Sequence, residues 1–591
     1  MTSAIPWFDS GGGSPSFSLD LQDSIVAAFA SGSGTPTYSR ASVATQRDFE
    51  NLYRTALSGE ARFQGARRVY NKIAYDSLSA LTSGTGTAVV TANYAAAPDG
   101  TVTAFRLQAT RGSGFGLAAS GPGGTSGYSN PHTSAHSIYM KSNTASSQSV
   151  GLGSSQGANA IVTVTTAWKR FAYNEALNNN VDGTYIGAIG ASDATLDILY
   201  VWPQEEDITG VTITAPSEYV SSGVLSAPYH GAGVDGVKYF STLNGNTVAS
   251  NVVTEATGAP IVTGASGVAA NAPVDARGPF GYLAEGAATQ LVTPTASIRD
   301  MTDASWVAGA TMTVAKNAIG ADGTANGAST LTGGAVEATN TILQTLVAAA
   351  SSRTNSALVR LVSGTGPVYL MQGATASADL FSSLNTSTYS LLELNASVLN
   401  VAFGFKLGVN TVIEVDMNQF EALAFATSRI LTAGATREVD ALSFPVTGNI
   451  SGTNGTAYAE FTTVTVPSAA GVSLVSSNNG GTEGVPLGAI LGTQEKLFMY
   501  DGTSTGVLSS VITRPVVSVM KVATSWGGSS WSGSVGGVVV SASTFDGNLN
   551  LTSSISIGSD ENATGMTFGT IRKVRIWTVA KTAAQLAQMT T

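Results

Sequence analysis

"AIVTVTTAWKRFAYN", residues 160–174, alternates apolar side chains with polar or small ones over most of its length. "NTVIEVDMNQFEAL", residues 410–423, has the same pattern. Successive side chains of a strand point to opposite faces of a sheet, so a period of two predicts half-buried β-strands. Gly, Ser and Asn separate such runs along the chain, and no long helical periodicity competes with them. The sequence therefore predicts an all-β fold built of antiparallel sandwiches of the jelly-roll type.

The composition supports several β-domains. Only 11% of the residues are charged, against about 25% in ordinary globular proteins, and 67 are glycine. The hydrophobic fraction of 43% argues against disorder. At roughly 150 residues per domain, a chain of 591 residues predicts three or four packed units.

Charge and cysteine content exclude several classes of protein. The net charge is −10, and no dense basic face indicates a nucleic-acid partner. The absence of cysteine excludes a disulfide scaffold, a thiolate nucleophile and a cysteine-ligated zinc site. We expect neither a signal peptide nor a membrane span, because "MTSAIPWFDSGGGSPSF" lacks a basic region followed by an apolar run, and no stretch of 18 apolar residues occurs.

Internal repetition divides the first two thirds of the chain. The Asp-Gly-Thr turn at residues 99–101 reappears at 322–324, and Asp-Gly is a strong turn signal in both places. Two further pairs align: "VGLGSSQG" (150–157) with "VRLVSGTG" (359–366), and "QEEDITGVTITAPSEYV" (204–220) with "QFEALAFATSRI" (419–430). We therefore expect two related jelly-roll modules.

The last part of the chain, from residue 445, alternates again, as in "AYAEFTTVTV" and "IRKVRIW". It does not align with the two modules, which predicts a third sandwich of another kind. The chain closes with "TAAQLAQM" (582–589), where Thr582 and Gln585 have capping-box spacing. This spacing predicts a short terminal helix.

These stretches carry a family resemblance. "YSRASVAT" followed by "SGEARFQGARRVYN" (58–71) and a sandwich resembles the start of tailed-bacteriophage virion proteins, in which a Gly-Ala-Arg-Arg-like strand and an Asn precede a carbohydrate-binding-module-like jelly roll. Asn71 keeps that Asn, whereas Gln290 replaces it in "GYLAEGAATQLV" (281–292). "FATSRILTAGATREVDALSF" resembles the exit strand of these modules, and the segment from "FDGNLNL" to the end resembles a concanavalin-A or laminin-G-like sandwich. The resemblance implies a virion fibre, spike or decoration protein.

A dense charged cluster in "SGEARFQGARRVYN" stands out in a chain with few charges. It contains Glu60, Arg62, Arg67 and Arg68. Arg67 and Arg68 lie between Ala66 and Val69, as on a strand that leads into a module and pairs locally or with a neighbouring subunit. We interpret the four residues as a structural joint. The alternative, a phosphate or nucleic-acid patch, needs a broader basic face with aromatic side chains to stack on bases.

Two groups of residues are candidates for metal binding or catalysis. His132 and His136 have a spacing of four that could bind a metal from one helical face, but no helix and no third ligand are expected there, so we place them on a surface loop. Glu414, Asp416 and Asn418 lie on one strand face, resembling the acidic strand of sandwich glycosidases, but the third acid is missing. A solvated strand face is the main interpretation, with a calcium or sugar contact as the alternative. We predict no enzymatic activity, no metal site and no cofactor, calcium being the one ion left open.

Sugar binding needs aromatic faces and planar polar groups. Trp526 and Trp531, in "TSWGGSSWSGS", are predicted on an exposed Gly/Ser-rich turn and are the main candidates. Trp168 is a weaker candidate, since a packed strand aromatic is the main expectation there. Trp7 and Phe8, before a Gly-Gly-Gly hinge, are candidates for anchoring to another virion protein, with a disordered N-terminus as the alternative.

The sequence thus predicts a non-enzymatic virion protein, a fibre or spike that displays lectin-like domains to host-surface glycans. A capsid decoration or head-fibre role is the alternative, and a polysaccharide depolymerase or an adhesin is less favoured. Its partners would be portal, capsid or tail proteins and further copies of the chain, a trimer first, with no nucleic acid and no membrane. The predicted parts are an N-terminal anchoring segment (1–39), a β-rich connector (40–70), jelly roll 1 (71–225), a second connector (226–289), jelly roll 2 (290–440) and a concanavalin-A-like sandwich (441–591).

Overall fold

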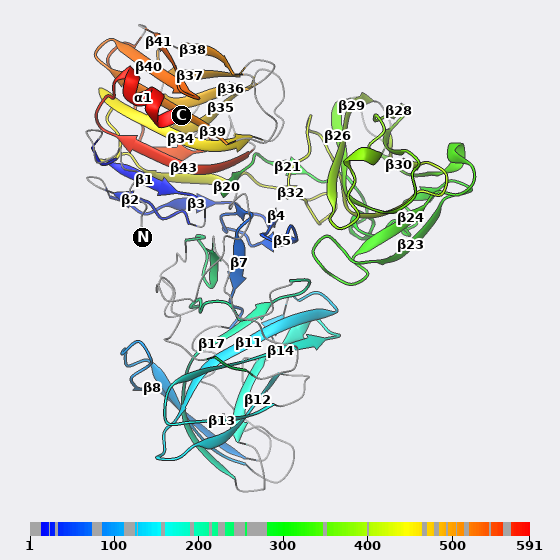
Figure 1. Ribbon diagram of the computed structural model, residues 1–591, viewed down its shortest axis with the longest axis vertical. Coiled ribbons are helices and arrows are strands. Elements are labelled where there is room, and N and C mark those ends of the chain that lie inside the picture. The colour runs from blue at the N-terminus through cyan, green and yellow to red at the C-terminus, as the bar shows by residue number, and fades with distance from the viewer. Residues whose placement is uncertain are drawn as a thin grey trace. The chain divides into compact units, whose positions relative to one another are not determined.

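The computed structural model confirms an all-β protein, with 52% of residues in strands and 4% in helices (Figure 1). Residues 67–276 and 322–325 form one compact unit, and the remainder of the chain forms another. The structure describes residues 13–22, 24–29, 33–73, 86–111, 125–126, 128–154, 160–188, 194–211, 216–222, 231–240, 254–256, 281–346, 351–398, 401–463, 470–477, 484–491, 495–503, 505–512, 519–542, 545–559 and 569–591.

The first jelly roll consists of two antiparallel sheets. The larger has the order β19-β14-β11-β17-β9-β8 and the smaller the order β13-β12-β16. Their bounds are β8 (Thr87–Ala95), β9 (Ala104–Thr110), β11 (His132–Ser142), β12 (Gln148–Ser154), β13 (Ala160–Val164), β14 (Lys169–Leu177), β16 (Thr184–Ala188), β17 (Thr195–Asp207) and β19 (Thr254–Ala256). A short pair of β10 (Thr125–Ser126) and β15 (Val181–Asp182) accompanies them.

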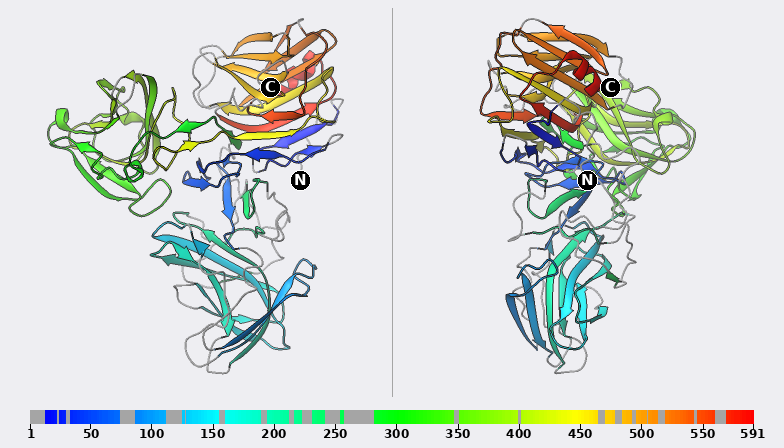
Figure 2. Two further views of the ribbon diagram at one scale, coloured as in Figure 1. Left: turned by 180° about the vertical axis from the view of Figure 1, so that it is seen from behind. Right: turned by 60° about the vertical axis from the view of Figure 1, so that its left-hand side comes forward.

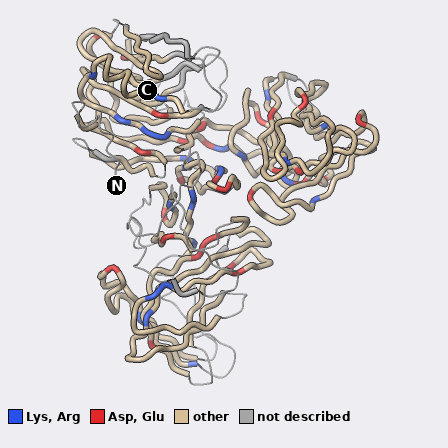
Figure 3. Tube along the Cα trace, viewed as in Figure 1, with Lys and Arg blue, Asp and Glu red and all other residues tan. Residues whose placement is uncertain are grey.

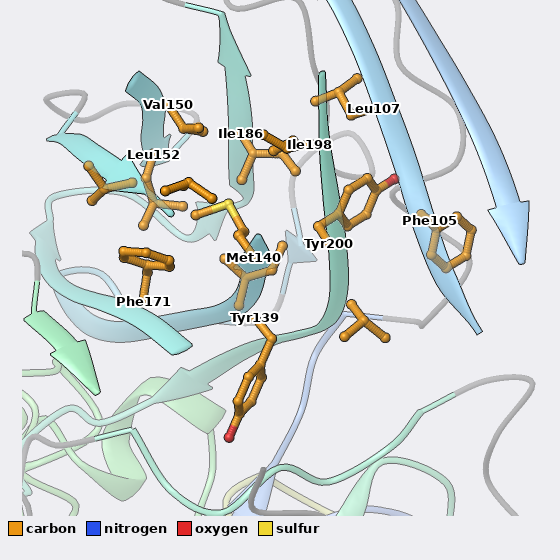
Figure 4. Packing of buried hydrophobic residues seen from close by; sticks show 14 of the residues in the cluster. Phe105, Leu107, Tyr139, Met140, Val150, Leu152, Phe171, Ile186, Ile198 and Tyr200 are labelled. Atoms are coloured by element: carbon orange, nitrogen blue, oxygen red, sulfur yellow. The ribbon is translucent and has the colours of Figure 1, made fainter. Parts of the chain in front are cut away.

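The core of this jelly roll lies between its two sheets. Met140 of β11 meets Leu152 of β12 and Ile186 of β16, as Figure 4 shows. All three side chains are fully buried. Burying an aliphatic side chain of this size stabilises the fold by about 1.5–3 kcal/mol, so the apolar half of the alternating pattern holds the sheets together.

The second jelly roll has two sheets of five strands each. Their orders are β23-β24-β31-β26-β29 and β22-β25-β30-β27-β28. The bounds are β22 (Val307–Ala308), β23 (Thr313–Ala318), β24 (Ala328–Thr332), β25 (Thr341–Leu346), β26 (Ser351–Ser363), β27 (Val368–Gln372), β28 (Thr375–Ala376), β29 (Ser390–Val398), β30 (Val401–Leu407) and β31 (Val412–Glu421). Three short 3-10 turns, η4 (Thr295–Ile298), η5 (Glu337–Thr339) and η6 (Phe381–Ser383), connect them.

The strand order repeats between the two jelly rolls. The run β8-β9-β17-β11-β14 corresponds to β23-β24-β31-β26-β29. In both copies of the Asp-Gly-Thr turn the Asp carboxylate accepts a hydrogen bond of 3.0 Å from the Thr backbone N–H. The Gly has a φ of 85° in one turn and 84° in the other, where a side chain would be strained. The predicted correspondence of these two turns is confirmed.

One predicted alignment needs correction. Residues 150–157 begin on β12, whereas residues 359–366 begin on β26, which is the counterpart of β11. Short Gly/Ser motifs follow strands in both sheets of a jelly roll, so such a match does not identify the strand.

The C-terminal sandwich packs a nine-stranded sheet against a seven-stranded one. The first contains β2-β1-β43-β34-β39-β40-β41, with β20 paired to β43 off this path and β6 paired to β20, and the second is β3-β33-β42-β35-β36-β37-β38. The bounds are β1 (Phe17–Asp20), β2 (Ala28–Phe29), β3 (Thr37–Ser39), β6 (Phe63–Gln64), β20 (Gly281–Ala284), β33 (Ala441–Pro445), β34 (Asn454–Thr463), β35 (Ala470–Ser476), β36 (Val485–Leu491), β37 (Glu495–Tyr500), β38 (Thr505–Ile512), β39 (Met520–Gly527), β40 (Ser530–Val535), β41 (Val538–Ala542), β42 (Ser554–Ile557) and β43 (Gly569–Trp577).

The N-terminal strands are part of this sandwich. β1 pairs with β43, with Phe17 opposite Ile576, and β3 pairs with β33. Phe17 is fully buried and its ring packs edge-on against Phe444 at 5.0 Å. The described strands of residues 1–39 therefore do not form a separate segment: β1 pairs with the last strand of the C-terminal sandwich and β3 with its first.

Each jelly roll begins and ends beside a short strand pair. β7 (Arg67–Tyr70) pairs with β18 (Val237–Phe240) at the first, and β21 (Ala288–Thr289) pairs with β32 (Thr436–Arg437) at the second. A further hairpin is formed by β4 (Ala44–Arg47) and β5 (Tyr53–Ala56). The second jelly roll is thus joined to the rest of the chain by two neighbouring strands, whereas the first also includes β19, which follows β18 in the sequence.

The predicted terminal helix is confirmed as α1 (Ala583–Thr590), which packs on β39 and β40 (Figure 2). Thr582 and Gln585 form the expected capping box: each side chain accepts a hydrogen bond from the other residue's backbone N–H. Among the described residues, no helix combines the length and hydropathy that crossing a bilayer requires.

Candidate functional site

Charged residues are sparse along the chain (Figure 3), and Arg62 is one of those that are buried. Its guanidinium donates to Glu285 at 2.9 Å and also to Asp440. Arg40 donates to the other oxygen of Asp440 at 2.9 Å, and Arg437 lies 3.6 Å from Glu285. Burial raises the pKa of Asp440, but Arg62 and Arg40 outweigh burial and lower the pKa to about 2. This buried ion cluster links the segment before the first jelly roll to the end of the second.

The other three residues of the charged cluster also have contacts within the chain. Arg67 donates to Glu218 at 2.5 Å, and its guanidinium lies 4.8 Å from the ring centroid of Phe240. Arg68 lies over the ring of Tyr70 at 5.2 Å. Glu60 is buried and accepts a hydrogen bond of 2.7 Å from the backbone N–H of Leu57. All four residues that we interpreted as a joint are therefore engaged in contacts within the chain, and Arg62 and Arg67 contact residues far away in the sequence.

Asn71 makes a set of four hydrogen bonds at the start of the first jelly roll. Its amide nitrogen donates to the carbonyls of Pro203 at 3.1 Å and Val220 at 2.9 Å. Its oxygen accepts from the backbone N–H groups of Ile73 at 3.1 Å and Glu205 at 3.2 Å. The side chain of Asn71 thus joins the segment after β7 to the end of β17 and to the segment that contains Val220.

Gln290 does the same in the second jelly roll. Its nitrogen donates to the carbonyls of Asn418 at 2.9 Å and Ile430 at 3.0 Å. Its oxygen accepts from the N–H groups of Val292 and Phe420, both at 3.1 Å. The expected substitution of Asn by Gln therefore keeps the whole set of contacts.

The predicted sugar site at Trp526 and Trp531 is wrong. Both side chains are 1% exposed. The two residues lie directly opposite each other on β39 and β40, which are joined by a turn of only residues 528–529. The indole of Trp526 donates to the carbonyl of Ser451 at 3.0 Å, and Trp531 stacks on Phe545 at 5.8 Å. Small residues make room for the rings, since a Cβ on Gly455 would lie 2.4 Å from Trp526. The Gly/Ser content therefore indicates close packing here.

The predicted solvated strand face is wrong for two of its three residues. Asp416 is fully buried, and its two oxygens accept from Arg299 at 2.9 and 2.8 Å. Asn418 is 1% exposed. Glu414 is half-buried and accepts from Arg360 at 2.6 Å. Both acids are thus paired with arginine side chains.

Trp168 lies at the edge of the first jelly roll and is half-buried. One side of it packs against the core, and the ammonium of Lys141 lies 5.7 Å from its ring centroid. It is thus partly a core residue, as mainly expected, and partly a surface residue. Trp7 and Phe8 lie outside the described residues, so the anchoring role stays a prediction.

Trp168 belongs to a row of side chains that crosses the outer face of the larger sheet. Lys141, Leu199 and Arg106 lie directly opposite one another on β11, β17 and β9, and Leu199, between the two cations, is only 2% exposed. Arg106 is held by Asp197 through two hydrogen bonds of 2.9 and 2.6 Å, and its guanidinium lies 4.8 Å from the ring of Tyr94, which is 44% exposed. We call Tyr94, Arg106, Leu199, Lys141 and Trp168 the first cation–aromatic row.

A similar row crosses the matching sheet of the second jelly roll. Thr330, Glu414 and Arg360 lie opposite one another on β24, β31 and β26. The guanidinium of Arg360 lies 5.1 Å from the ring of Tyr389, which stands just before β29 as Trp168 stands just before β14. We call Thr330, Glu414, Arg360 and Tyr389 the second cation–aromatic row. Aromatic rings pack against the CH face of a sugar, and fixed polar groups hydrogen-bond to its hydroxyls.

Sequence reasoning missed Tyr94, Arg106 and Asp197. The alternation of strand β9 places Arg106 on the face opposite Phe105 and Leu107, and that signal was present. Its pairing with Asp197, 91 residues away, required the strand order.

The surface-loop placement of His132 and His136 is also wrong. Both lie on β11 and are at most 2% exposed. The polar letters of "PHTSAHS" hide a period of two that turns both rings and Ser134 to the same face. Asp182, more than 40 residues later, lies against them, with the Nε2 of His136 3.1 Å from its Oδ2.

The chain matches no protein-family profile, and no curated protein is similar to it. Among solved structures it is similar to domain 4 of AbnA, an extracellular arabinanase of Geobacillus stearothermophilus in complex with arabinotriose, at 15% identity and a TM-score of 0.21, over 26% of this chain and 73% of that one. A tandem carbohydrate-binding domain, CBM22-1–CBM22-2 of Paenibacillus barcinonensis Xyn10C, has 13% identity and a TM-score of 0.20, over 62% and 100%. A Trypanosoma rangeli sialidase has 9% identity and a TM-score of 0.19, over 94% and 98%. At these TM-scores the likenesses do not assign a fold family or a function.

Proposed function

We propose that this chain is a non-catalytic, glycan-binding display protein. The observation that carries the proposal is the recurrence of the cation–aromatic row at the same place on both jelly rolls. The core faces of these sheets are needed for packing, whereas an outer face is free to vary. A cation stacked on an aromatic side chain at the matching end of both sheets is therefore best explained by a shared ligand class, sugars with apolar faces and hydroxyls.

The proposed setting is a tailed-phage virion, with the chain as a fibre or spike. The support is the sequence resemblance around residues 58–71 and 281–292, together with the matching hydrogen bonds of Asn71 and Gln290. A head-fibre or capsid-decoration position is the alternative setting. Other virion proteins and two further copies of the chain are the proposed partners.

Binding is tested with the full chain on immobilised bacterial surface polysaccharides. Removing one aromatic or cationic contact should weaken binding by about tenfold, so Trp168→Ala and Arg106→Ala should each raise the dissociation constant to that extent. Ile161→Ala is the matched control, because Ile161 is 68% exposed on the opposite sheet of the same jelly roll. Equal binding by all four proteins contradicts the proposal.

The absence of catalysis is tested by incubating the chain with the polysaccharide that it binds and measuring reducing ends. We expect none. If sugar is released and Glu414→Gln stops the release, the protein is a depolymerase. The virion setting is tested by imaging the particle at a resolution that traces this chain in its density.

A further inference from the structure

A buried cluster of histidine and carboxylate side chains lies at one end of the first jelly roll. The Nε2 atoms of His136 and His132 lie 3.1 and 3.7 Å from Oδ2 of Asp182. Glu175 of β14 completes the cluster: one ligand atom each from His136, Glu175 and Asp182 lie within 4.8 Å of one another. The four side chains belong to residues that are at most 5% exposed.

Neighbouring side chains fix the orientation of these groups. The hydroxyl of Thr184 lies 2.7 Å from Nδ1 of His136, and the ring of Tyr173 stacks on His136 at 4.5 Å. Ser134 donates to Asp182. Partners of this kind set the tautomer and the direction of a histidine that binds a metal, so the surroundings of the cluster are those of a built site.

The second jelly roll shows that the fold does not require this cluster. His136 lies directly opposite Glu205 on the neighbouring strand. At the matching place in the second jelly roll, Asn355 lies opposite Phe420 and Leu394. The same strand order thus forms with an amide and two apolar side chains. Burying several ionisable groups is costly, so their presence in one copy alone points to a role other than folding.

Among the described residues, Nε2 of His132, which faces Oδ2 of Asp182 at 3.7 Å, forms no hydrogen bond, and neither does the hydroxyl of Tyr173, whose ring stacks on His136. Both residues are 2% exposed. Three buried carboxylates surround the ring of His136: Asp182 and Glu175 belong to the cluster, and Oε2 of Glu205 lies 3.9 Å from Nδ1 of His136. A bound cation would place positive charge among them.

We propose that His136, Glu175 and Asp182 bind a divalent first-row transition-metal ion, of which zinc is the representative, with His132 as an adjacent nitrogen ligand. Mixed imidazole and carboxylate ligands suit zinc, whereas calcium and magnesium prefer oxygen alone. The ion joins β11, β14 and β15, and it therefore tightens one end of this jelly roll. The site is independent of the proposed glycan binding, and it replaces the expectation of no metal other than calcium.

The test uses the full chain, stripped with a chelator and then dialysed against zinc chloride or calcium chloride. We expect about one zinc ion per chain by elemental analysis and no retained calcium. His136→Asn should retain less than about a tenth of the zinc, and it should fold, because Asn stands at the matching place in the second jelly roll. Asp99→Asn removes an exposed carboxylate of the same jelly roll and should keep the zinc.

A second measurement needs no variant. Cobalt loaded into the stripped chain should give hyperfine-shifted imidazole N–H signals in the proton NMR spectrum, because the ion is bound to histidine nitrogen. If His136→Asn does not fold, Asp182→Asn takes its place in the zinc measurement. Equal zinc retention by the wild type and the folded variant, preferential retention of calcium, or a cobalt form without shifted imidazole signals overturns the proposal.

Discussion

Asn71 and Gln290 make the same four hydrogen bonds in two different jelly rolls. Each amide donates to two carbonyls and accepts from two backbone N–H groups, at 2.9 to 3.2 Å. Both are at most 1% exposed. Because two side chains of different length fill one place, the requirement lies in the backbone groups that they join, at the point where the chain enters and leaves each module.

Replacing Asn71 by Ala should therefore destabilise the first jelly roll. Buried carbonyl and N–H groups lose their partners, and the expected loss is about 3 kcal/mol in the free energy of unfolding. Urea unfolding followed by circular dichroism measures it. Gln108→Ala, an exposed amide on β9, is the control and should change stability by less than about 0.5 kcal/mol. Similar losses for the two variants would show that Asn71 does not hold the module together.

The buried ion cluster predicts a larger effect at Arg62. Arg62→Met removes the arginine that hydrogen-bonds to both buried carboxylates, Glu285 and Asp440, so we expect a loss of about 3–5 kcal/mol. Arg360→Met breaks a pair whose side chains are 24% and 14% exposed, and it should cost less than about 1 kcal/mol. The denaturant midpoints of the two variants are compared with that of the wild type. A large shift for Arg62→Met and a small one for Arg360→Met are expected if the buried cluster is a structural joint.

The same cluster predicts acid sensitivity. The pKa of Asp440 is about 2 in the folded chain and ordinarily about 4. Because the pKa of Asp440 is lower in the folded chain than in the unfolded chain, its carboxylate stabilises the fold at pH values above its ordinary pKa. This stabilisation is lost as the pH falls from about 4 to 2. The loss should be about 2 kcal/mol in the free energy of unfolding, measured by denaturant titration at a series of pH values. The pKa of Glu285 is also lowered, despite burial, by Arg437 and Arg62, so Glu285 adds to the loss of stability at low pH. In Asp440→Asn the free energy of unfolding should change less between about pH 4 and pH 2. An unchanged pH dependence would assign the effect to other acids.

Much of the fold could be predicted from the sequence because strand periodicity and Asp-Gly turns are local signals. The repeated turn at residues 99–101 and 322–324 and the capping box at Thr582 are of this kind. The pairing of β1 with β43 could not be predicted, since backbone hydrogen bonds between residues more than 540 positions apart leave no local pattern. The placement of Phe17 in the C-terminal core follows only from that pairing.

The candidate site was less predictable for the same reason. Trp526 and Trp531 stand among Gly and Ser, a composition shared by exposed turns and by strands packed closely on large rings. His136 acquires its partner Asp182 only when two sheets face each other. Residue type alone therefore identified aromatic and ionisable candidates, and the strand order decided which of them face solvent.

The corrected position of Trp531 predicts a core effect. Trp531→Ala removes a buried ring stacked on Phe545 and should destabilise the C-terminal sandwich by about 3–5 kcal/mol. Val538→Ala, on the adjacent strand and 57% exposed, should have little effect. Thermal unfolding of the full chain measures both. If Trp531→Ala keeps its stability and loses glycan binding, the exposed-site interpretation is restored.

The two cation–aromatic rows predict avidity on a glycan surface. If each row binds one sugar segment, a chain attached through both dissociates more slowly than a chain attached through one. Trp168→Ala and Tyr389→Ala should each increase the dissociation rate from an immobilised polysaccharide by about tenfold, and the double variant should lose measurable binding. Ile161→Ala and Val307→Ala, 68% and 69% exposed on the opposite sheets of the two jelly rolls, are the matched controls. Biolayer interferometry at several polysaccharide densities distinguishes binding through both rows from binding through one row. With two active rows the wild type should bind more tightly as density rises, whereas each single variant should be insensitive to density. If Tyr389→Ala leaves the dissociation rate unchanged at every density, the second row takes no part in binding and the shared-ligand argument fails.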